Sequence, residues 1–433
     1  MIGGTDETHD PSLISWVEGA TDHLDFPIQN LPFGIFSVGD STPRPGVAIG
    51  DHILDLTRVA SLLPAAAANV MGGQTLNALL ALPCDDRRAL RHRLSELLSD
   101  GRHRDQVEPA LNAAAECTLH LPCAIGDYTD FYVGIHHANN IGRQFRPDNP
   151  LLPNYKWVPI GYHGRASSVR QSGVPVLRPN GQHKAPDSDS PAFGPSQRLD
   201  YELELGVWVG QGNPLGTAIP IREAERHVAG FCLLNDWSAR DLQAWEYQPL
   251  GPFLAKSFQS TISPWVVTAE ALAPFRAAQS ARQEGDPHPL PYLWDERDQQ
   301  HGELAIDLEV HLVTQIMRDS ALPPYRLSHG LATNMYWTVA QMVAHHTSNG
   351  CNLRPGDLLG TGTISAPTED GFGSLMEITR GGTQPIELPT GEKRSFLDDG
   401  DEIILSATAR AEGFRSIGFG ACRAVVLPAL GAP

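Results

Sequence analysis

Residues 201–206 read YELELG and place two carboxylates, Glu202 and Glu204, two positions apart. Successive side chains of a β-strand point to opposite faces, so these two carboxylates share one face of a predicted strand. The apolar run GVWVG at 206–210 follows, and we expect it to lead the strand into the core. Hard divalent cations such as Mg²⁺ and Ca²⁺ prefer several converging carboxylate oxygens. The spacing alone leaves a second interpretation open, a solvated polar face on an edge strand.

A third carboxylate, Asp236, lies further along the chain in the string NDWSARD at 235–241. If the following stretch is helical, Arg240, Gln243 and Tyr247 stand at positions i, i+3 and i+7, which is one helix face. Their donor groups suit a carboxylate or a developing oxyanion. The alternative is a solvated helix face. Two tryptophans in the stretch nevertheless indicate burial, where unpaired polar groups are costly.

The chain of 433 residues is long enough for two domains, and its 35 prolines and 41 glycines indicate many turns and a β-rich fold. Residues 1–24 have the character of a loosely held N-terminal extension. The segment LPCAIG at 121–126 is predicted to separate a small β-rich domain with helices, 25–120, from a larger β-rich domain, 121–433. We expect a hairpin turn at Gly50-Asp51, an amphipathic helix at 86–98, a helix at 334–346 and an exposed loop at 274–300.

The net charge of −18 argues against nucleic acids and anionic membrane surfaces as partners. An anionic substrate would therefore need cations supplied locally, as a metal ion, arginine or lysine. No apolar stretch approaches the roughly 20 residues of a membrane span, and the polar start of the chain lacks a signal-peptide pattern. Six cysteines without paired short spacing are not a disulfide framework. We therefore expect a reducing, cytoplasmic setting.

Other polar strings offer acid–base groups without a familiar catalytic signature. Residues 127–137 (DYTDFYVGIHH) hold two acids, two tyrosines and two histidines, each of which could also be a hydrogen-bonded structural residue. The string YHGR at 162–165 is interpreted as shaping a loop. Glycines at 360–363 would let the backbone approach a ligand closely. Glu377 lies in a predicted apolar strand, where a buried acid needs a partner such as histidine. The chain has no G-x-S-x-G, C-x-x-C or H-E-x-x-H motif and no dinucleotide fingerprint.

Six short sequence strings occur along the chain in the same order as in the members of one protein family. They lie at 25–32 (DFPIQNLP), 126–132 (GDYTDFY), 158–168 (VPIGYHGRASS), 235–241, 349–365 and 418–422 (GFGAC). Together they resemble the fumarylacetoacetate hydrolase family in its full-length, two-domain form. The resemblance implies a mostly β (α+β) protein with an N-terminal SH3-like β-barrel and a C-terminal mixed β-roll, assembled as a homodimer. It also implies hydrolysis of a carbon–carbon bond of 4-fumarylacetoacetate to fumarate and acetoacetate, the last step of tyrosine and phenylalanine catabolism.

The same resemblance implies one divalent cation, Mg²⁺ or Ca²⁺, and roles for particular residues. It implies a metal site at Asp130, Glu202, Glu204 and Asp236, with Lys256 and Ser260 beside it. It implies that His137 rather than His136 is the general base, paired with Glu377, and that Arg240, Gln243 and Lys256 stabilise an oxyanion. The positions that match substrate-binding residues are Tyr132, Arg146, Gln243, Tyr247 and Thr363.

Charge balance gives the basic residues a function in such a site. Four carboxylates with one divalent cation would still repel a dianionic substrate, unless Lys256, Arg240 and Arg146 offset the remaining negative charge. One departure from the family pattern is that Gln259 and Ser260 stand where glycine and threonine are typical. The alternatives are an acylpyruvate hydrolase or an oxaloacetate decarboxylase of the same superfamily, or a non-catalytic metal-binding protein on the same fold.

Overall fold

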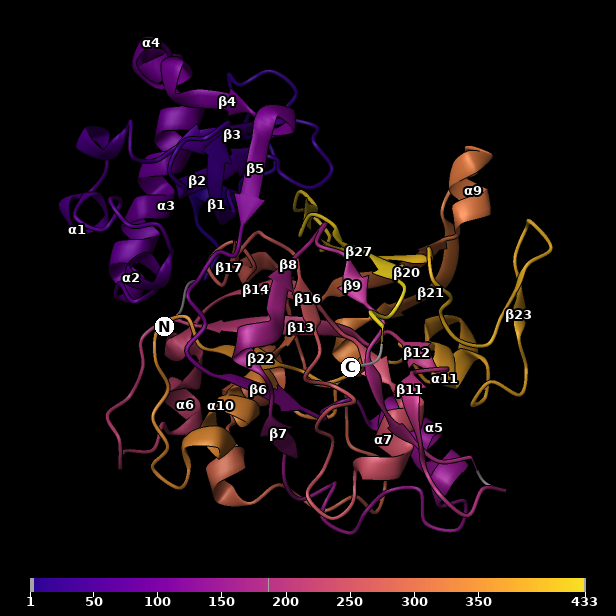
Figure 1. Ribbon diagram of the computed structural model, residues 1–433. Helices are drawn as coiled ribbons and strands as arrows, with labels where there is room; N and C mark the ends of the chain where they lie inside the picture. Colours follow the sequence, from indigo (N-terminus) through magenta and orange to yellow (C-terminus); the bar gives the residue numbers. More distant parts are fainter. Residues whose placement is uncertain (1–3, 186, 432–433) are drawn as a thin grey trace.

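The computed structural model describes residues 4–185 and 187–431, and Figure 1 shows a small lobe near the N-terminus beside a larger one. The small lobe holds a five-stranded antiparallel sheet in the order β4-β3-β2-β1-β5. Its strands are β1 (Phe33–Val38), β2 (Arg44–Ile49), β3 (His52–Asp55), β4 (Leu111–Ala113) and β5 (Cys117–His120). Ile49 pairs with His52, so Gly50-Asp51 is the two-residue turn that was predicted, and Gly50 has the positive φ of 54° typical of such turns.

Helices pack against this sheet, and the longest is α3 (Cys84–Ser99), which confirms the amphipathic helix predicted at 86–98. The other helices of the lobe are α1 (Ala65–Ala68), α2 (Asn77–Leu80) and α4 (Arg104–Val107). The leucines of α3 at 90, 94, 97 and 98 are buried and occupy one face, at positions i, i+4, i+7 and i+8. This apolar stripe fixes which side of α3 faces the sheet.

The larger lobe is organised around a mixed sheet in the order β7-β6-β22-β13-β14-β16-β8, with β17 also paired to β14. Its strands are β6 (Tyr128–Phe131), β7 (Gly161–His163), β8 (Val169–Gln171), β13 (Leu203–Val209), β14 (Val228–Asp236), β16 (Ser260–Ile262), β17 (Val267–Thr268) and β22 (Leu358–Gly360). Strands β13 and β14 are antiparallel and buried along their whole length, as the apolar run in β13 predicts. Leu203 pairs with Asn235 and Glu204 with Leu234, so Glu204 on β13 is a diagonal neighbour of Asp236 at the end of β14.

A second sheet in the order β21-β20-β25-β27-β9 shares an apolar cluster with the first. Its strands are β9 (Val176–Leu177), β20 (Ile306–Val313), β21 (Tyr325–Leu331), β25 (Glu402–Ala409) and β27 (Cys422–Leu427), with β26 (Ile417–Gly418) on β25. Two-stranded pairs are β10 (Asn180–His183) with β11 (Ala192–Pro195), β12 (Leu199–Asp200) with β15 (Ser238–Ala239), β18 (Arg276–Ala277) with β19 (Glu303–Leu304), and β23 (Ile386–Glu387) with β24 (Lys393–Arg394). The helices of this lobe are α5 (Ile135–Phe145), α6 (Ile221–Ala224), α7 (Arg240–Glu246), α8 (Glu296–His301), α9 (Gln315–Asp319), α10 (Val339–Thr347) and α11 (Leu375–Ile378).

The helix predicted at 334–346 is α10, but it begins later than the sequence suggested. Thr338 is its N-cap, and the Thr338 hydroxyl accepts a hydrogen bond from the backbone N–H of Gln341. The side chain of Gln341 in turn accepts from the backbone N–H of Thr338. This reciprocal capping pair fixes the start of the helix and leaves the residues before it in a 3₁₀ turn and a loop.

The N-terminal segment is packed rather than loosely held, which corrects the expectation for its described residues, 4–24. Arg91 of α3 is buried and donates to the Thr8 hydroxyl and to the backbone carbonyl of Asn30. His9 is also buried, and its Nε2 donates to the backbone carbonyl of Glu270 in the larger lobe. The segment therefore joins α3 to the larger lobe, held both by these polar side chains and by Val17 and Ala20, which are buried in the apolar core.

One apolar cluster runs through both lobes. It includes Leu54 of the small sheet and Leu94 of α3, together with Trp208, Leu234 and Leu358 of the large sheet. Burying a side chain of this kind contributes about 1.5–3 kcal/mol. The two lobes are thus held together by a shared core as well as by hydrogen bonds.

The exposed loop expected at 274–300 is only partly observed, because 278–290 form a loop that is largely exposed whereas the residues on either side of it are structured. They include β18 and part of α8, and the guanidinium of Arg282 lies 4.3 Å from the ring centre of Tyr336 and 4.5 Å from that of Trp337. Arg282 also donates to the Tyr336 hydroxyl at 2.8 Å. A segment rich in Arg, Gln and Pro can pack by stacking on aromatic rings, which a search for apolar periodicity does not detect.

Within residues 4–185 and 187–431, no helix combines the length and apolar character that crossing a membrane requires. All six cysteines are free. Cys123, Cys232 and Cys422 are buried, and Cys351 is partly exposed.

Candidate metal centre and active site

Three buried carboxylates converge in the large sheet. Asp130 lies on β6, Glu204 on β13 and Asp236 at the end of β14. One oxygen atom from each lies within 4.8 Å of the other two, and none of the three residues is more than 2% exposed. The sheet order β6-β22-β13-β14 brings these residues together although they are far apart in the sequence.

Two of these carboxylates have oxygen atoms without partners. Asp130 Oδ1 and Glu204 Oε1 are buried, and no hydrogen-bond donor of the described residues reaches either atom. Burial and the charge of Asp236 raise the pKa of Asp130 well above its ordinary value. Burial and the charges of Asp130 and Asp236 do the same to the pKa of Glu204. A hard divalent cation would satisfy these oxygens and offset the crowded negative charge, so the donor set fits such an ion.

The backbone after β22 lies directly against the cluster. A Cβ atom on Gly360 would lie 2.5 Å from Asp130 Oδ1 and 2.9 Å from Glu204 Oε2, so no larger residue fits there. The backbone N–H of Gly362 donates to Glu204 Oε2 at 3.0 Å. The close backbone approach expected at 360–363 therefore occurs at the carboxylates.

Two hydroxyl groups also contact the cluster. The Tyr162 hydroxyl lies 2.9 Å from both Asp130 Oδ2 and Asp236 Oδ2, and Ser260 Oγ donates to Asp236 Oδ1 at 2.8 Å. The sequence interpretation of 162–165 as only a loop-shaping string is therefore wrong for Tyr162. Gln259 is buried, and its side-chain amide donates to Thr261 Oγ1 at 3.3 Å. It has no positive φ, so this departure from the family pattern causes no backbone strain.

Glu202 lies just before β13 and, unlike Asp130 and Glu204, it is surrounded by positively charged side chains. Arg240 Nη1 is 2.6 Å from Glu202 Oε1, and Lys256 Nζ is 2.8 Å from Glu202 Oε2. Ser238 Oγ donates to the same carboxylate at 2.9 Å. Burial alone would raise the pKa of Glu202, but the charges of Lys256 and Arg240 lower it. Lys256 Nζ also lies 2.6 Å from Asp236 Oδ2, so it bridges Glu202 and the three converging carboxylates.

A histidine–glutamate pair lies on two helices of the same lobe. His137 is on α5 and its Nδ1 lies 2.6 Å from Glu377 Oε2, with both residues buried. Ser365 and Ser374 donate to that same oxygen, and Asn140 donates to Glu377 Oε1 at 2.9 Å. Although burial works in the other direction, the nearby His137 lowers the pKa of Glu377. Because Nδ1 is engaged, Nε2 is the ring nitrogen left for proton transfer.

Glu377 is not on a strand, which corrects the sequence prediction. It lies on the short helix α11, whose N-cap is Ser374. The apolar residues around it suggested a strand because a four-residue helix is too short to display a helical period.

The residues that the family resemblance assigns to substrate binding are less closely grouped than the carboxylates. Tyr132 packs edge-on against the ring of His137, with the ring centres 5.7 Å apart. Gln243 Oε1 accepts from Arg240 Nη1 at 3.2 Å, on α7. Thr363 Oγ1 is buried without a partner among the described residues. Arg146 donates to the backbone carbonyl of Pro150, and the Tyr247 hydroxyl accepts from Gln248, so these bonds do not connect either side chain to the carboxylates.

Sequence reasoning missed several residues that touch this network. They are the three serines that donate to Glu202 and Glu377, together with Tyr162, Asn140 and Asp200. Asp200 is fully buried and accepts hydrogen bonds from Arg240. Its signal was present, because Asp200, Glu202 and Glu204 alternate along the chain and so extend the same strand face. Asn140 carried no signal beyond its position one turn from His137 on α5.

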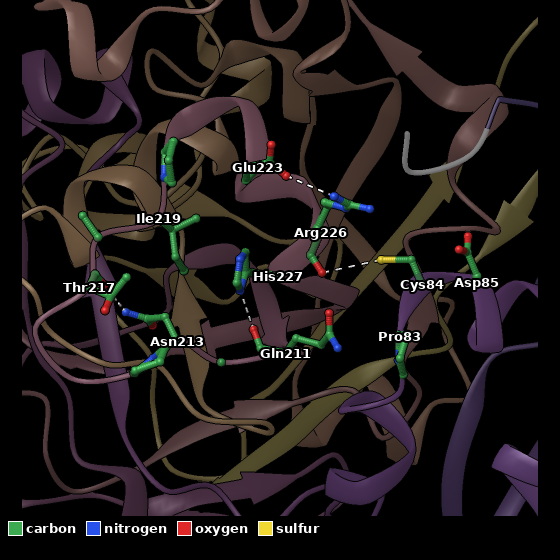
Figure 2. A pocket seen from close by; sticks show the side chains of 14 residues that line it. Pro83, Cys84, Asp85, Gln211, Asn213, Thr217, Ile219, Glu223, Arg226 and His227 are labelled. Atoms are coloured by element: carbon green, nitrogen blue, oxygen red, sulfur yellow. Dashed lines mark hydrogen bonds and ion pairs between the residues drawn. The ribbon is translucent and has the colours of Figure 1, made fainter.

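Two hollows differ in their relation to this network. A cavity of about 300 Å³ is lined by Tyr162, Asp236 and Lys256 and therefore reaches the carboxylates. A cavity of about 490 Å³, shown in Figure 2, lies between Pro83 at the start of α3 and His227 and contains none of the carboxylates described above. Its polar groups largely pair with one another, since Glu223 contacts Arg226, and His227 Nδ1 donates to the Gln211 carbonyl. Of these two cavities, the smaller is therefore the one that reaches the carboxylates.

Comparison with known proteins agrees with this arrangement. Residues 128–427 match the profile "Fumarylacetoacetate (FAA) hydrolase C-terminal", and residues 29–122 match "Fumarylacetoacetase N-terminal". The chain belongs to the fumarylacetoacetate hydrolase family. A family relative named "Fumarylacetoacetase" in Caenorhabditis elegans is 49% identical over 418 residues, which cover 94% of this chain and 97% of the relative. One of the same name in Homo sapiens is 48% identical over 417 residues, with 94% and 97% covered.

A solved structure of a fumarylacetoacetate hydrolase from Exiguobacterium antarcticum aligns with a TM-score of 0.51 and 17% identity, over 92% of this chain and 99% of that one. Identity at that level shows a common fold only. The assignment to the fumarylacetoacetate hydrolase family therefore rests on the profile matches and on the relatives of nearly half identity. The family-wide use of a divalent cation agrees with the buried acidic cluster.

Proposed function

We propose that this chain is a hydrolase that cleaves a carbon–carbon bond of 4-fumarylacetoacetate to give fumarate and acetoacetate. The observation that carries the proposal is the near-complete coverage by relatives named "Fumarylacetoacetase", at 49% and 48% identity. The reaction closes tyrosine and phenylalanine catabolism. This reaction requires a buried cluster of carboxylates, a histidine–glutamate pair and positively charged side chains, and Arg240 and Lys256 are such side chains.

The cation would be held by Asp130, Glu204 and Asp236, with Glu202 as the fourth carboxylate. We propose Mg²⁺ or Ca²⁺, because both prefer carboxylate oxygens. When bound, such a cation supplies Lewis-acid chemistry and a template for two ketone-type oxygens. Support comes from the partnerless oxygens of Asp130 and Glu204. Ser260 and Lys256 would orient Asp236, since both contact its carboxylate.

His137 would act as general base. Its Nε2 would take a proton from a water molecule, while Glu377 holds Nδ1–H and stabilises the imidazolium that forms. The resulting hydroxide would attack the carbonyl carbon next to the fumaryl group. Support comes from the 2.6 Å contact between Nδ1 and Glu377 Oε2 and from the three further donors to that carboxylate.

Arg240, Gln243 and Lys256 would stabilise the oxyanion that this attack creates. When the oxyanion collapses, the carbon–carbon bond breaks and its electron pair passes to the acetoacetate fragment. The protonated His137 can then return its proton to that fragment, which balances the reaction. Tyr132, Arg146, Gln243, Tyr247 and Thr363 would bind the substrate. The contact of Tyr132 with His137 and that of Gln243 with Arg240 support this assignment.

The proposal extends to the architecture and setting of the enzyme. The small sheet would be an SH3-like barrel within a domain at 25–120, following the extension at 1–24, and 121–433 would be a mixed β-roll. A reducing cytoplasm suits six free cysteines. A homodimer is supported by exposed apolar side chains near α7, including Phe193 and Trp245, which lie on adjacent elements. Light scattering of the purified protein would give its oligomeric state.

The test follows the ultraviolet absorbance of fumarylacetoacetate with purified protein and Mg²⁺, with and without a chelator. Rapid loss that needs the metal, with fumarate formed in equal amount, is the expected result. No loss under metal-replete conditions would contradict the proposal. Acylpyruvates and oxaloacetate would then be the next substrates, and Gln259→Gly the first variant.

A further inference from the structure

Asp200 is a buried carboxylate whose role neither the metal cluster nor the base accounts for. It ends β12, two residues before Glu202, and is fully buried. It is not one of the three carboxylates that converge on each other. Both of its oxygens nevertheless act as acceptors. Oδ1 accepts from the backbone N–H of the next residue, Tyr201, at 2.9 Å, and the other donors come from two separate parts of the site.

The first set of donors is the start of α11. The backbone N–H of Leu375 donates to Asp200 Oδ1 at 2.8 Å, and that of Met376 donates to Oδ2 at 3.0 Å. The first N–H groups of a helix have no partner within the helix, and an anion there is favourable. Because α11 has only four residues, its own hydrogen bonds cannot fix its direction. Asp200 therefore anchors the turn that carries Glu377.

The second donor is the guanidinium of Arg240. Nε and Nη2 both lie 2.9 Å from Asp200 Oδ2. The third nitrogen, Nη1, contacts Glu202 and Gln243 at 2.6 Å and 3.2 Å. One edge of the planar group is thus fastened to Asp200, which determines where Nη1 lies.

We propose that Asp200 is a positioning residue that sets the distance between the base and the oxyanion-binding group. One carboxylate holds both the helical turn of Glu377, the partner of His137, and the guanidinium of Arg240. Asp200 contacts neither the converging carboxylates nor His137, so it acts through these two residues. The inference rests on the proposed function, because the distance between the two groups affects rate only if both act on one substrate.

The main variant is Asp200→Asn, which preserves volume but replaces one acceptor oxygen with an NH₂ group. If that group replaces Oδ1, it would face the backbone N–H groups of Leu375 and Tyr201. If it replaces Oδ2, it would face the Met376 N–H and the edge of Arg240, so in either case at least one of these donors must move. We expect kcat to fall about 100-fold, the cost of a displacement of roughly 1 Å in a reacting pair. We expect KM to change little, because Asp200 does not touch the substrate.

A matched control is Asp298→Asn, which makes the same change at another buried carboxylate. Asp298 accepts from the Thr338 hydroxyl and lies outside the network of site residues described here. Its kcat should stay near that of the wild type. A loss of kcat in Asp298→Asn as large as that in Asp200→Asn would show a general effect of disturbing the core, and would overturn the inference.

A second readout does not depend on activity. The proton between His137 Nδ1 and Glu377 should give a low-field NMR signal, assigned by its loss in His137→Gln. Asp200→Asn should move or abolish this signal, whereas Arg240→Lys, which leaves Asp200 on α11, should preserve it while lowering kcat. An unchanged signal and an unchanged kcat in Asp200→Asn would overturn the inference.

The two hypotheses fail in different ways. If the wild type does not cleave fumarylacetoacetate, the proposed function fails, and the NMR signal alone still tests the positioning role. If Asp200→Asn does not fold, Asp200→Glu keeps the charge and both acceptor oxygens but lengthens the side chain. It should also shift the signal and lower kcat by at least tenfold, about 1.4 kcal/mol, and wild-type behaviour would overturn the inference.

Discussion

Glu202 and Glu204 are two residues apart on one strand face, yet they lie in opposite electrostatic surroundings. Glu202 contacts Arg240 and Lys256, and its pKa is lowered. Glu204 faces Asp130 and Asp236, has an oxygen without a partner, and its pKa is raised. The difference shows where the protein supplies its own positive charge and where it does not. Oxygen atoms without a partner lie in the second region, which is where a metal ion would add most. Glu202 would join that ion as a fourth carboxylate, held in place by Arg240 and Lys256.

The largest effect is expected from His137, whose Nδ1 is paired with Glu377. His137→Gln should lower kcat by about 10²–10⁴-fold, the usual contribution of a general base. The measurement is the initial rate of fumarylacetoacetate loss at saturating Mg²⁺.

The neighbouring histidine provides the control for that variant. His136→Gln removes a half-buried imidazole one residue away and should leave kcat nearly unchanged. Full activity in His137→Gln, or an equal loss in both variants, would refute the assignment of the base.

The second effect concerns stability and compares the two glutamates directly. In metal-free protein, Glu202→Gln should lower the free energy of unfolding by about 2–3 kcal/mol. This is somewhat below the 3–5 kcal/mol usual for a broken buried ion pair, since Arg240 and Lys256 each keep a second carboxylate. Glu204→Gln should be neutral or stabilising, because it removes repulsion. Urea unfolding in the presence of a chelator measures the free energy of unfolding of both variants. An equal loss of stability in the two would contradict the distinction between the two regions.

The third effect is a pH dependence of metal binding. In the metal-free fold Asp130 and Glu204 have raised pKa values, so they favour the folded state at acid pH. That contribution is lost as the pH rises from their ordinary pKa values towards the raised ones. A bound cation displaces their protons, so its stabilising effect should grow with pH, by up to about 1.4 kcal/mol per pH unit for each proton released. Melting temperatures with Mg²⁺ and with chelator at pH 5.5 and pH 8 test this, and a gap that does not widen contradicts it.

The smallest effect is expected from Ser260, which donates to Asp236. Ser260→Ala should weaken cation binding by about tenfold, the lower range for a residue that orients a ligand. Ser257→Ala is a suitable control, because Ser257 lines the same cavity without a side-chain bond to a carboxylate. Titration calorimetry with Mg²⁺ compares them, and equal affinities would mean that Ser260 does not orient Asp236.

The two-residue spacing of Glu202 and Glu204 was enough to predict that they share one face, because the period of two follows directly from backbone geometry. The Gly-Asp step predicted the turn at Gly50-Asp51, and the amphipathic pattern at 86–98 predicted the helix α3. In both places local chemistry and long-range packing agree. The charged neighbours of the two glutamates were not predictable from spacing. Those of Glu202 come from α7 and from the loop that carries Lys256, and those of Glu204 come from distant strands. Only the family resemblance suggested which residues assemble around them.

The failures share a physical cause. Glu377 was assigned to a strand because α11 is too short to show a period, and its start depends on Asp200 from another strand. Residues 4–24 were described as loose, although His9 bonds to the larger lobe and Val17 and Ala20 are buried. Residues 274–300 were described as exposed, although Arg282 stacks on the ring of Tyr336. Contacts between polar side chains carry no periodic signal.

The apolar cluster that passes from α3 and Leu54 to Trp208 and Leu234 has a calorimetric consequence. Two lobes that share one core cannot expose it separately, so heating should give a single endothermic peak whose van't Hoff and calorimetric enthalpies agree. His9 and Arg91 extend that linkage to the first residues of the chain. A fragment consisting of the larger lobe alone would expose half of a hydrophobic interface, and we expect it to aggregate rather than to fold as an independent unit.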